Sequence, residues 1–153
     1  KIINIIMSIV SNICITNSSG NKMQEINNIK VIASKGIVND RYFKDNNDKD
    51  TQITLIESEN IDHFNEISGT NFVASDFRRN IITKGIRLND LINKRIKVGE
   101  VNMLVHRLCD PCKYLQDLLS QKNLVKNLLN KGGLRCEVLS SGEISIEDKI
   151  IIL

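Results

Sequence analysis

Short runs rich in isoleucine and valine, each closed by turn-forming residues, restrict the fold of this chain more than any other feature. The runs have the length of strands rather than helices, and Gly, Asn, Asp and Ser cluster between them. The predicted strands lie in segments 7–16, 26–34, 52–57, 79–85 and 94–108, and a closing hairpin is predicted over 134–153. A chain built in this way favours a mainly β fold.

Two segments have helical spacing instead. Residues 57–68 carry Ile61, Phe64 and Ile67 on one face, which predicts a short middle helix that ends at Gly69. A long late helix is predicted from Pro111 to about Asn130, with a break near 121–123 as an alternative and Gly132-Gly133 as its end. Strands and helices do not alternate regularly, so we expect an α+β fold with a β-barrel or strongly curved sheet and helices at its side.

Length and charge restrict the class of protein further. The 153 residues suffice for one domain, predicted over 8–153, with 1–7 as an N-terminal extension or the start of the first strand. The formal net charge is only +3 and the basic residues are scattered, so no nucleic-acid partner is expected. The apolar N-terminus is too short and too polar to span a bilayer, so no membrane association is expected either.

The cysteines indicate a reducing compartment. Cys14, Cys109, Cys112 and Cys136 are irregularly spaced and do not resemble a disulfide framework. We therefore expect free thiols and a cytoplasmic location.

The stretch "HRLCDPCKYL", residues 106–115, contains the motif most suggestive of chemistry. Asp110 suits a helix N-cap and Pro111 the first helical position, which would place Cys112 in the first turn. Free backbone N–H groups there favour an anion and hence a reactive or metal-ligating thiolate.

Four interpretations of this motif stay open from local physics. Both cysteines can be buried packing residues. A zinc site would need Cys136 and one of His63 or His106 to complete four ligands. A redox pair of the thioredoxin type would need a parallel strand–helix–strand setting, which this pattern does not predict. The fourth interpretation is a single reactive or metal-ligating thiolate at Cys112.

Five segments taken together resemble a known family. "KGIVNDRYF", "QITLIE", "RRNIITKGIRLNDLINKRIKVGEV", "RLCDPCKYL" and "GGLRCEVLSSGEISIEDKI" are similar in order and spacing to the MOSC domain, named for the C-terminal domain of molybdenum cofactor sulfurases. The resemblance covers roughly residues 8–153. It implies a MOSC-type β-barrel and a role connected with molybdenum cofactor, a pterin that carries a dithiolene and a phosphate.

The resemblance also implies site residues. The hallmark cysteine of the family corresponds to Cys112, which would ligate molybdenum or receive sulfur. Cys109 would either resolve a persulfide or mixed disulfide on Cys112 or simply pack. The implied cofactor contacts are Arg41, Arg78 and Asn80, with Arg79 and Arg107 as weaker candidates. Arg135 matches a family position from which it would reach the site or lie on the surface.

The family pattern is altered at two turns. Asn39 stands where the family has a second glycine, and Asn tolerates positive φ better than most residues. Glu147-Asp148 replaces a Gly-Asp pair near the C-terminus, a change expected to affect only a turn. Neither departure removes a proposed ligand.

The functional prediction is therefore a protein that binds molybdenum cofactor through Cys112. It would act as a small oxidoreductase on an N-hydroxylated compound, or as a carrier of cofactor or sulfur. The expected partners are a cysteine desulfurase, an electron-transfer protein or a molybdoenzyme. The alternatives are a non-catalytic docking module for a desulfurase or molybdoenzyme, and a thiol redox protein that uses Cys109 and Cys112 without a cofactor.

Overall fold

Strands form most of the regular structure of residues 7–153, the part of the chain that this computed structural model describes. The strands are β1 Ile9–Ile15, β2 Gln24–Ile26, β3 Asn28–Ile32, β4 Gly36–Ile37, β5 Ile53–Glu57, β6 Ile81–Lys84, β7 Arg95–Val98, β8 Val101–Leu108, β9 Leu134–Val138, β10 Gly142–Ser145 and β11 Ile150–Ile152. The α-helices are α1 Ser58–Ser68, α2 Lys113–Leu118 and α3 Leu124–Asn127. Two short 3₁₀ helices, η1 Ala74–Phe77 and η2 Leu88–Leu91, complete the fold.

The predicted extension, residues 1–7, falls almost wholly outside the described residues, because the description begins at Met7. The first strand starts at Ile9. None of the helices within residues 7–153 combines the length and the hydrophobicity that a membrane span requires.

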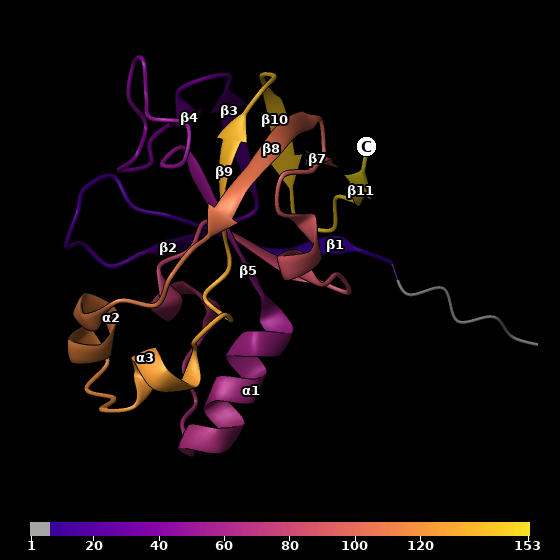
Figure 1. The fold of residues 1–153 in the computed structure, drawn as a ribbon. Coiled ribbons are helices and arrows are strands. Elements are labelled where there is room, and N and C mark those ends of the chain that lie inside the picture. Colours follow the sequence, from indigo (N-terminus) through magenta and orange to yellow (C-terminus); the bar gives the residue numbers. More distant parts are fainter. Residues whose placement is uncertain (1–6) are drawn as a thin grey trace, which may run out of the picture.

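The main sheet curls toward a barrel. Its eight strands run in the order β11-β7-β8-β9-β5-β6-β1-β2, and a smaller sheet has the order β10-β3-β4. Backbone hydrogen bonds from Val10 to Asp148 and from Ile150 to Ser8 join β1, near one edge, to the residues around β11, the other edge. The expected mainly β, barrel-like architecture is confirmed, with the helices gathered beneath the strands in Figure 1.

Side chains that alternate along β1, β5 and β6 contribute to two separate hydrophobic cores. Leu55 of β5 and Ile81 of β6 point into the barrel core, whereas their neighbours Ile56 and Ile82 pack under the helices. The second core also holds Phe64 of α1 and the buried leucines of α2 and α3. Because both faces of β5 and β6 are covered, their sequences are almost continuously apolar.

The long late helix is the main correction to the sequence prediction. Residues 113–127 form two short helices, α2 and α3, separated at 119–123 where a break was the alternative. Leu119 and Ser120 leave the helical path, and Ser120 has φ 53°. Leu115 and Leu124 are still buried in the second core, so the apolar spacing marked burial correctly although the helix is not continuous.

The predicted closing hairpin is also wrong. β9 pairs with β5 and β8 in the main sheet, whereas β10 pairs with β3 in the smaller sheet. The turn at 140–142 therefore carries the chain from one sheet to the other. Segment 26–34 likewise contains β3 together with the end of β2, rather than one strand.

One strand–helix–strand unit is present that the sequence pattern did not predict. β5 and β6 are parallel and joined through α1, which ends at Gly69 with φ 65° as expected. The two cysteines of the CxxC motif follow β8 instead, and both neighbours of β8 are antiparallel to it. The motif therefore lies outside the parallel unit that a thioredoxin-type pair would use.

Candidate functional site

A cavity of about 400 Å³, here called the central cavity, opens where several loops meet the start of α2. Its walls come from the loop after β1, the loop after β4, the residues before β6, the start of β9 and residues 110–115. The lining residues are Ser19, Gly20, Arg41, Tyr42, Arg78, Arg79, Asp110, Cys112, Tyr114, Leu115 and Arg135. Four arginines and the exposed cysteine of the CxxC motif thus share one cavity.

Cys112 is the exposed thiol of this cavity, and the other three cysteines are buried. It occupies the N-cap position of α2 with φ −121° and ψ 157°, so the helix begins two residues later than predicted from Asp110 and Pro111. The cause is tertiary packing, because the backbone of Cys109 and Pro111 lies directly against Gly132. The macrodipole of a helix of six residues stabilises a thiolate at Cys112 only weakly. The positive charges near Cys112 are instead the arginines on the other walls of the cavity.

Arg41 is held almost immobile at the cavity. Only 6% of its side chain is exposed, and its Nη1 lies 3.4 Å from an oxygen of Asp40. Its Nη2 donates to the carbonyl of Arg78 over 3.1 Å, and its guanidinium lies 4.2 Å from the ring centre of Tyr42. The charge of Arg41 is therefore shared with a carboxylate before any ligand binds.

Arg79 joins three backbone segments around the cavity. Its Nε donates to the carbonyl of Gly132 at 2.9 Å, and its Nη2 donates to the carbonyl of Asp110 at 3.3 Å. A third, longer bond of 3.4 Å reaches the carbonyl of Phe77. These partners are neutral, so the positive charge of Arg79 stays available to an anion while the side chain fixes the loop that carries Cys112.

Arg78 adopts a left-handed backbone conformation with φ 59° at the end of η1. This conformation costs free energy for a residue other than glycine. Its side chain donates to the carbonyl of Asn21 over 2.8 Å. The strained turn thus directs Arg78 toward the loop after β1, where it forms part of the cavity wall.

Arg135 has an unsatisfied donor. Its Nε is buried and lacks a hydrogen-bond partner among residues 7–153. Buried donors are normally paired, so this guanidinium nitrogen is a donor without an acceptor, and a ligand in the cavity would reach it only after a local shift of the atoms that cover it. The sequence left Arg135 undecided between site and surface, and the structure places it in the cavity wall.

Three predicted site residues lie outside this cavity. Asn80 is fully buried, its Oδ1 accepts from the N–H and the hydroxyl of Thr54, and its Nδ2 donates to the carbonyl of Cys14. Arg107 pairs with Asp50 at 2.8 Å on the surface. Cys109 is 2% exposed. Direct cofactor contacts by Asn80 and Arg107 therefore have no support in this geometry, and Cys109 is packed in the interior.

Burial governs the other thiols. It raises the pKa of Cys14 to about 12, with a smaller contribution from the nearby charge of Glu25. Burial raises the pKa of Cys136 as well, and the proximity of Cys109 adds to the effect. Among residues 7–153, no group of three or more His, Cys, Asp or Glu side chains is placed to hold a metal ion, so the zinc alternative lacks its ligand set.

The two altered turns keep their backbone shape. Asn39 has φ 72° and Glu147 has φ 71°, so both occupy the left-handed region that glycine usually fills. The turn before Asp40 and Arg41 therefore survives, as expected. Tyr42 and Tyr114 line the cavity without having been predicted, because the sequence shows neither cation–π stacking nor exposure toward a cavity.

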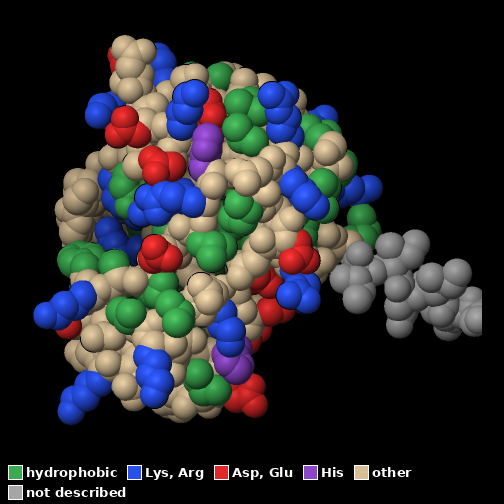
Figure 2. Space-filling view, in the orientation of Figure 1, with side chains coloured by type: hydrophobic (Ala, Val, Ile, Leu, Met, Phe, Trp, Pro, Cys, Tyr) green, Lys and Arg blue, Asp and Glu red, His purple; other side chains and the backbone are tan. Residues whose placement is uncertain are grey.

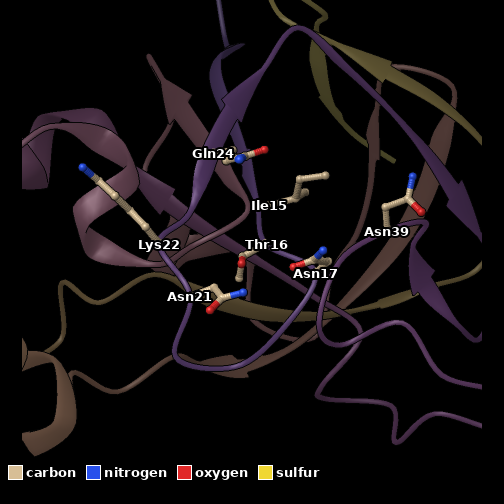
Figure 3. Close-up of a pocket in the computed structure, with 7 residues that line it drawn as sticks. All are labelled: Ile15, Thr16, Asn17, Asn21, Lys22, Gln24 and Asn39. Carbon is tan, nitrogen blue, oxygen red and sulfur yellow. The ribbon is translucent and has the colours of Figure 1, made fainter.

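A separate hollow of about 320 Å³ is lined by the end of β1, the loop after it and Asn39. Figure 3 shows its polar lining, in which Asn17, Asn21, Gln24 and Asn39 surround Thr16. It contains none of the cysteines or arginines that line the central cavity. Lys22 is the one charged residue of its lining, and the hollow brings together no set of groups like the thiol and arginines of the central cavity, which is therefore the better candidate for chemistry.

Comparison with known proteins agrees with this fold. The family model of the MOSC domain matches residues 39–151. Among curated proteins, none matches the sequence.

Solved structures provide the other likeness. The YuaD protein from Bacillus subtilis is 17% identical, with 95% of both chains covered and a TM-score of 0.80. YiiM from Geobacillus stearothermophilus is 18% identical, with 95% of this chain and 75% of that chain covered and a TM-score of 0.79. YiiM from Escherichia coli is 16% identical, with 95% and 69% covered and a TM-score of 0.72. At such low identity these structures establish the fold alone.

Proposed function

Because this chain belongs to the MOSC domain family, which is linked to molybdenum cofactor sulfurases, we propose that its central cavity binds molybdenum cofactor. Cys112 is proposed as the thiolate that ligates the metal or accepts sulfur. The observation that carries the proposal is the meeting of the exposed cysteine with four arginines in one cavity. The soft thiolate and the hard anion-binding groups match the two ends of a pterin that carries both a dithiolene-bound metal and a phosphate.

The residues present fit such a group. A volume of about 400 Å³ falls within the range of small-ligand sites, which is roughly 300–1,000 Å³. Within residues 7–153, Arg78, Arg79 and Arg135 form no salt bridge, and Asp110 is the one carboxylate of the lining, so the cavity holds a net positive charge. The unpartnered Nε of Arg135 adds an unused donor. Both features favour an anionic ligand with several acceptor oxygens.

The two walls of the central cavity would contact different parts of the cofactor. Arg79 and Arg135 would hold the phosphate or the polar edge of the pterin, because both line the cavity from the sheet side, where backbone carbonyls hold Arg79 in place. Cys112 would supply the thiolate from the opposite wall, and Leu115 would exclude water beside it. The bound cofactor would supply either two-electron redox chemistry or a site for sulfur.

The exposure of Cys112 supports a role in transfer as well as in catalysis. A cysteine desulfurase could deliver sulfur by attack of the Cys112 thiolate on its persulfide, which forms a persulfide on Cys112 and releases the desulfurase thiolate. An oxidoreductase role on an N-hydroxylated compound would need an electron-transfer partner at the same opening. In both roles a partner must approach the wall formed by α2.

The test is the molybdenum and pterin content per chain after expression in a host that makes the cofactor. We expect near-stoichiometric molybdenum in the wild type and its loss in Cys112→Ser. Lys113→Gln is the matched control, since Lys113 is exposed beside Cys112 and does not line the cavity. The absence of molybdenum from both wild type and Lys113→Gln would contradict stable cofactor binding.

A further inference from the structure

A second cavity adjoins the central one. This side cavity has a volume of about 320 Å³ and is lined by Gly20, Lys22, Met23, Ser75, Asp76, Arg78, Leu118 and Leu119. It shares Gly20 and Arg78 with the central cavity. The two cavities are therefore neighbours that meet at Gly20 and Arg78.

Helix α2 shows how far apart the two cavities are. Tyr114 and Leu115 line the central cavity, whereas Leu118 and Leu119 line the side cavity. Tyr114 and Leu118 are four residues apart on α2, so they lie one above the other at a spacing of about 5–6 Å, and Leu119 follows directly at the end of the helix. One small molecule can therefore reach into both cavities.

The floor and wall of the side cavity are apolar. Met23 is 3% exposed, and Leu119 packs against the second core. Leu118 is 52% exposed at the end of α2, a position from which a bound molecule would cover it. Figure 2 shows such apolar side chains beside Lys and Arg over the region of α2 and α3.

The charged groups favour an anion at the rim. Lys22 and Arg78 are the two cations of the lining, and neither is part of a salt bridge within residues 7–153. Asp76 opposes them, but its carboxylate already accepts the backbone N–H of Val73 at 2.9 Å. The balance is one net positive charge next to an apolar floor.

From this arrangement we propose that the side cavity binds the body of the reacting molecule, an aryl or alkyl compound that carries an anionic group. Its apolar part lies on Leu118, Leu119 and Met23, and its anionic group lies between Lys22 and Arg78. Its other end extends one helical turn along α2 into the central cavity. The inference rests on the proposed function for the statement that chemistry occurs there, whereas binding in the side cavity is independent of the cofactor.

The probe is anilinonaphthalene sulfonate, which joins an aromatic body to an anion and fluoresces when it leaves water. We expect one molecule bound per wild-type chain. Leu118→Asn should weaken its affinity about tenfold, because the covered leucine side chain is lost. Leu129→Asn should leave it unchanged, since Leu129 is 62% exposed and lines neither cavity.

The uncharged analogue phenylnaphthylamine tests the anionic part, and it should bind about tenfold more weakly than the sulfonate at low salt. Circular dichroism of each variant verifies that the probe reports a folded chain. Equal affinities of the two leucine variants, equal affinities of the two probes, or several probe molecules per chain would each overturn the proposal. Cys112→Ser should retain probe binding, so a failure of cofactor binding and a failure of the side cavity are separate results.

Discussion

The central cavity has two unlike walls. On the sheet side, Arg79 and Arg135 stand at the ends of buried strands, and Arg79 is 8% exposed. On the helix side, Cys112 and Tyr114 belong to an exposed segment whose helix has six residues. The difference shows that the fold holds Arg79 in place and leaves the thiol of Cys112 accessible.

Anion binding by the arginines and reactivity of the thiol require different surroundings. Guanidinium groups must be held in place to bind an anion tightly, and strands with buried hydrogen bonds provide that rigidity. A thiol that ligates a metal or exchanges sulfur must instead remain unprotected, because burial raises its pKa and blocks access. Cys14 and Cys136 are buried, and burial raises the pKa of both thiols.

The close approach of Gly133 to β5, on the sheet side, should be the feature most sensitive to substitution. A Cβ on Gly133, which has φ 99°, would collide with the backbone carbonyl of Leu55. Gly133→Ala should therefore lower the free energy of unfolding by about 4 kcal/mol or more, as measured by urea denaturation. Gly69→Ala is the matched control, since Gly69 also has positive φ but open space around it, and it should cost only about 1 kcal/mol. Similar losses in both variants would show that the close approach of Gly133 to β5 does not matter.

The sheet wall should lose stability when Asn80 is removed. Asn80→Ala leaves the N–H of Thr54 and the carbonyl of Cys14 without their buried partner. We expect a loss of about 3 kcal/mol in the free energy of unfolding. Asn89→Ala is the control, because Asn89 is exposed and makes one side-chain bond to Asn130. A variant at Asn80 of wild-type stability that fails to bind cofactor would restore the direct role predicted from the family resemblance.

The thiols should react in accordance with their positions. At about pH 8, Cys14 should hold roughly a thousandfold less thiolate than a thiol with the usual pKa of 9.0, because burial raises its pKa to about 12. Iodoacetamide should therefore label one cysteine per folded chain, Cys112, as read by peptide mass spectrometry. Labelling of Cys14 or Cys136 at a comparable rate in the folded protein would contradict the conclusion that Cys112 alone of these thiols is accessible.

Substitution of Arg107, which lies outside the cavity, should have the smallest effect on the free energy of unfolding. Its hydrogen bond lowers the pKa of Asp50, so the pair stabilises the fold above the usual carboxyl pKa and loses this effect as the pH falls through the lowered value. Arg107→Gln should cost roughly 0.5 kcal/mol at neutral pH, because the pair is exposed and screened by salt. Denaturation series across pH and salt should show the difference disappear in acid and shrink in high salt. A difference that persists in acid would assign Arg107 another role.

Much of the fold could be predicted from the sequence because strand periodicity is local. The runs around Ile9–Ile15 and Ile53–Glu57 are strands as expected. The pairing of β10 with β3 could not be predicted, since the turn residues at 140–142 do not indicate with which strand the next segment pairs. The late helix was too long in the prediction because apolar spacing reports burial and not helical continuity.

The candidate site was predictable only in part. Family resemblance pointed to Cys112, Arg41, Arg78 and Arg79, and these residues share the central cavity. The same resemblance pointed to Asn80, whose burial beneath the site depends on the tertiary fold and not on its neighbours in sequence. Arg135 became a stronger candidate only when its unpartnered Nε was seen.

The most direct test of the divided cavity is the pterin and molybdenum content of three variants prepared side by side. Arg135 and Arg107 are cross-strand partners on β9 and β8, yet only Arg135 lines the cavity. We predict that Arg135→Gln loses both pterin and molybdenum, Arg107→Gln keeps both, and Cys112→Ser loses molybdenum while retaining more pterin than Arg135→Gln. Equal cofactor content in Arg135→Gln and Arg107→Gln would contradict the claim that the sheet-side arginines hold the cofactor.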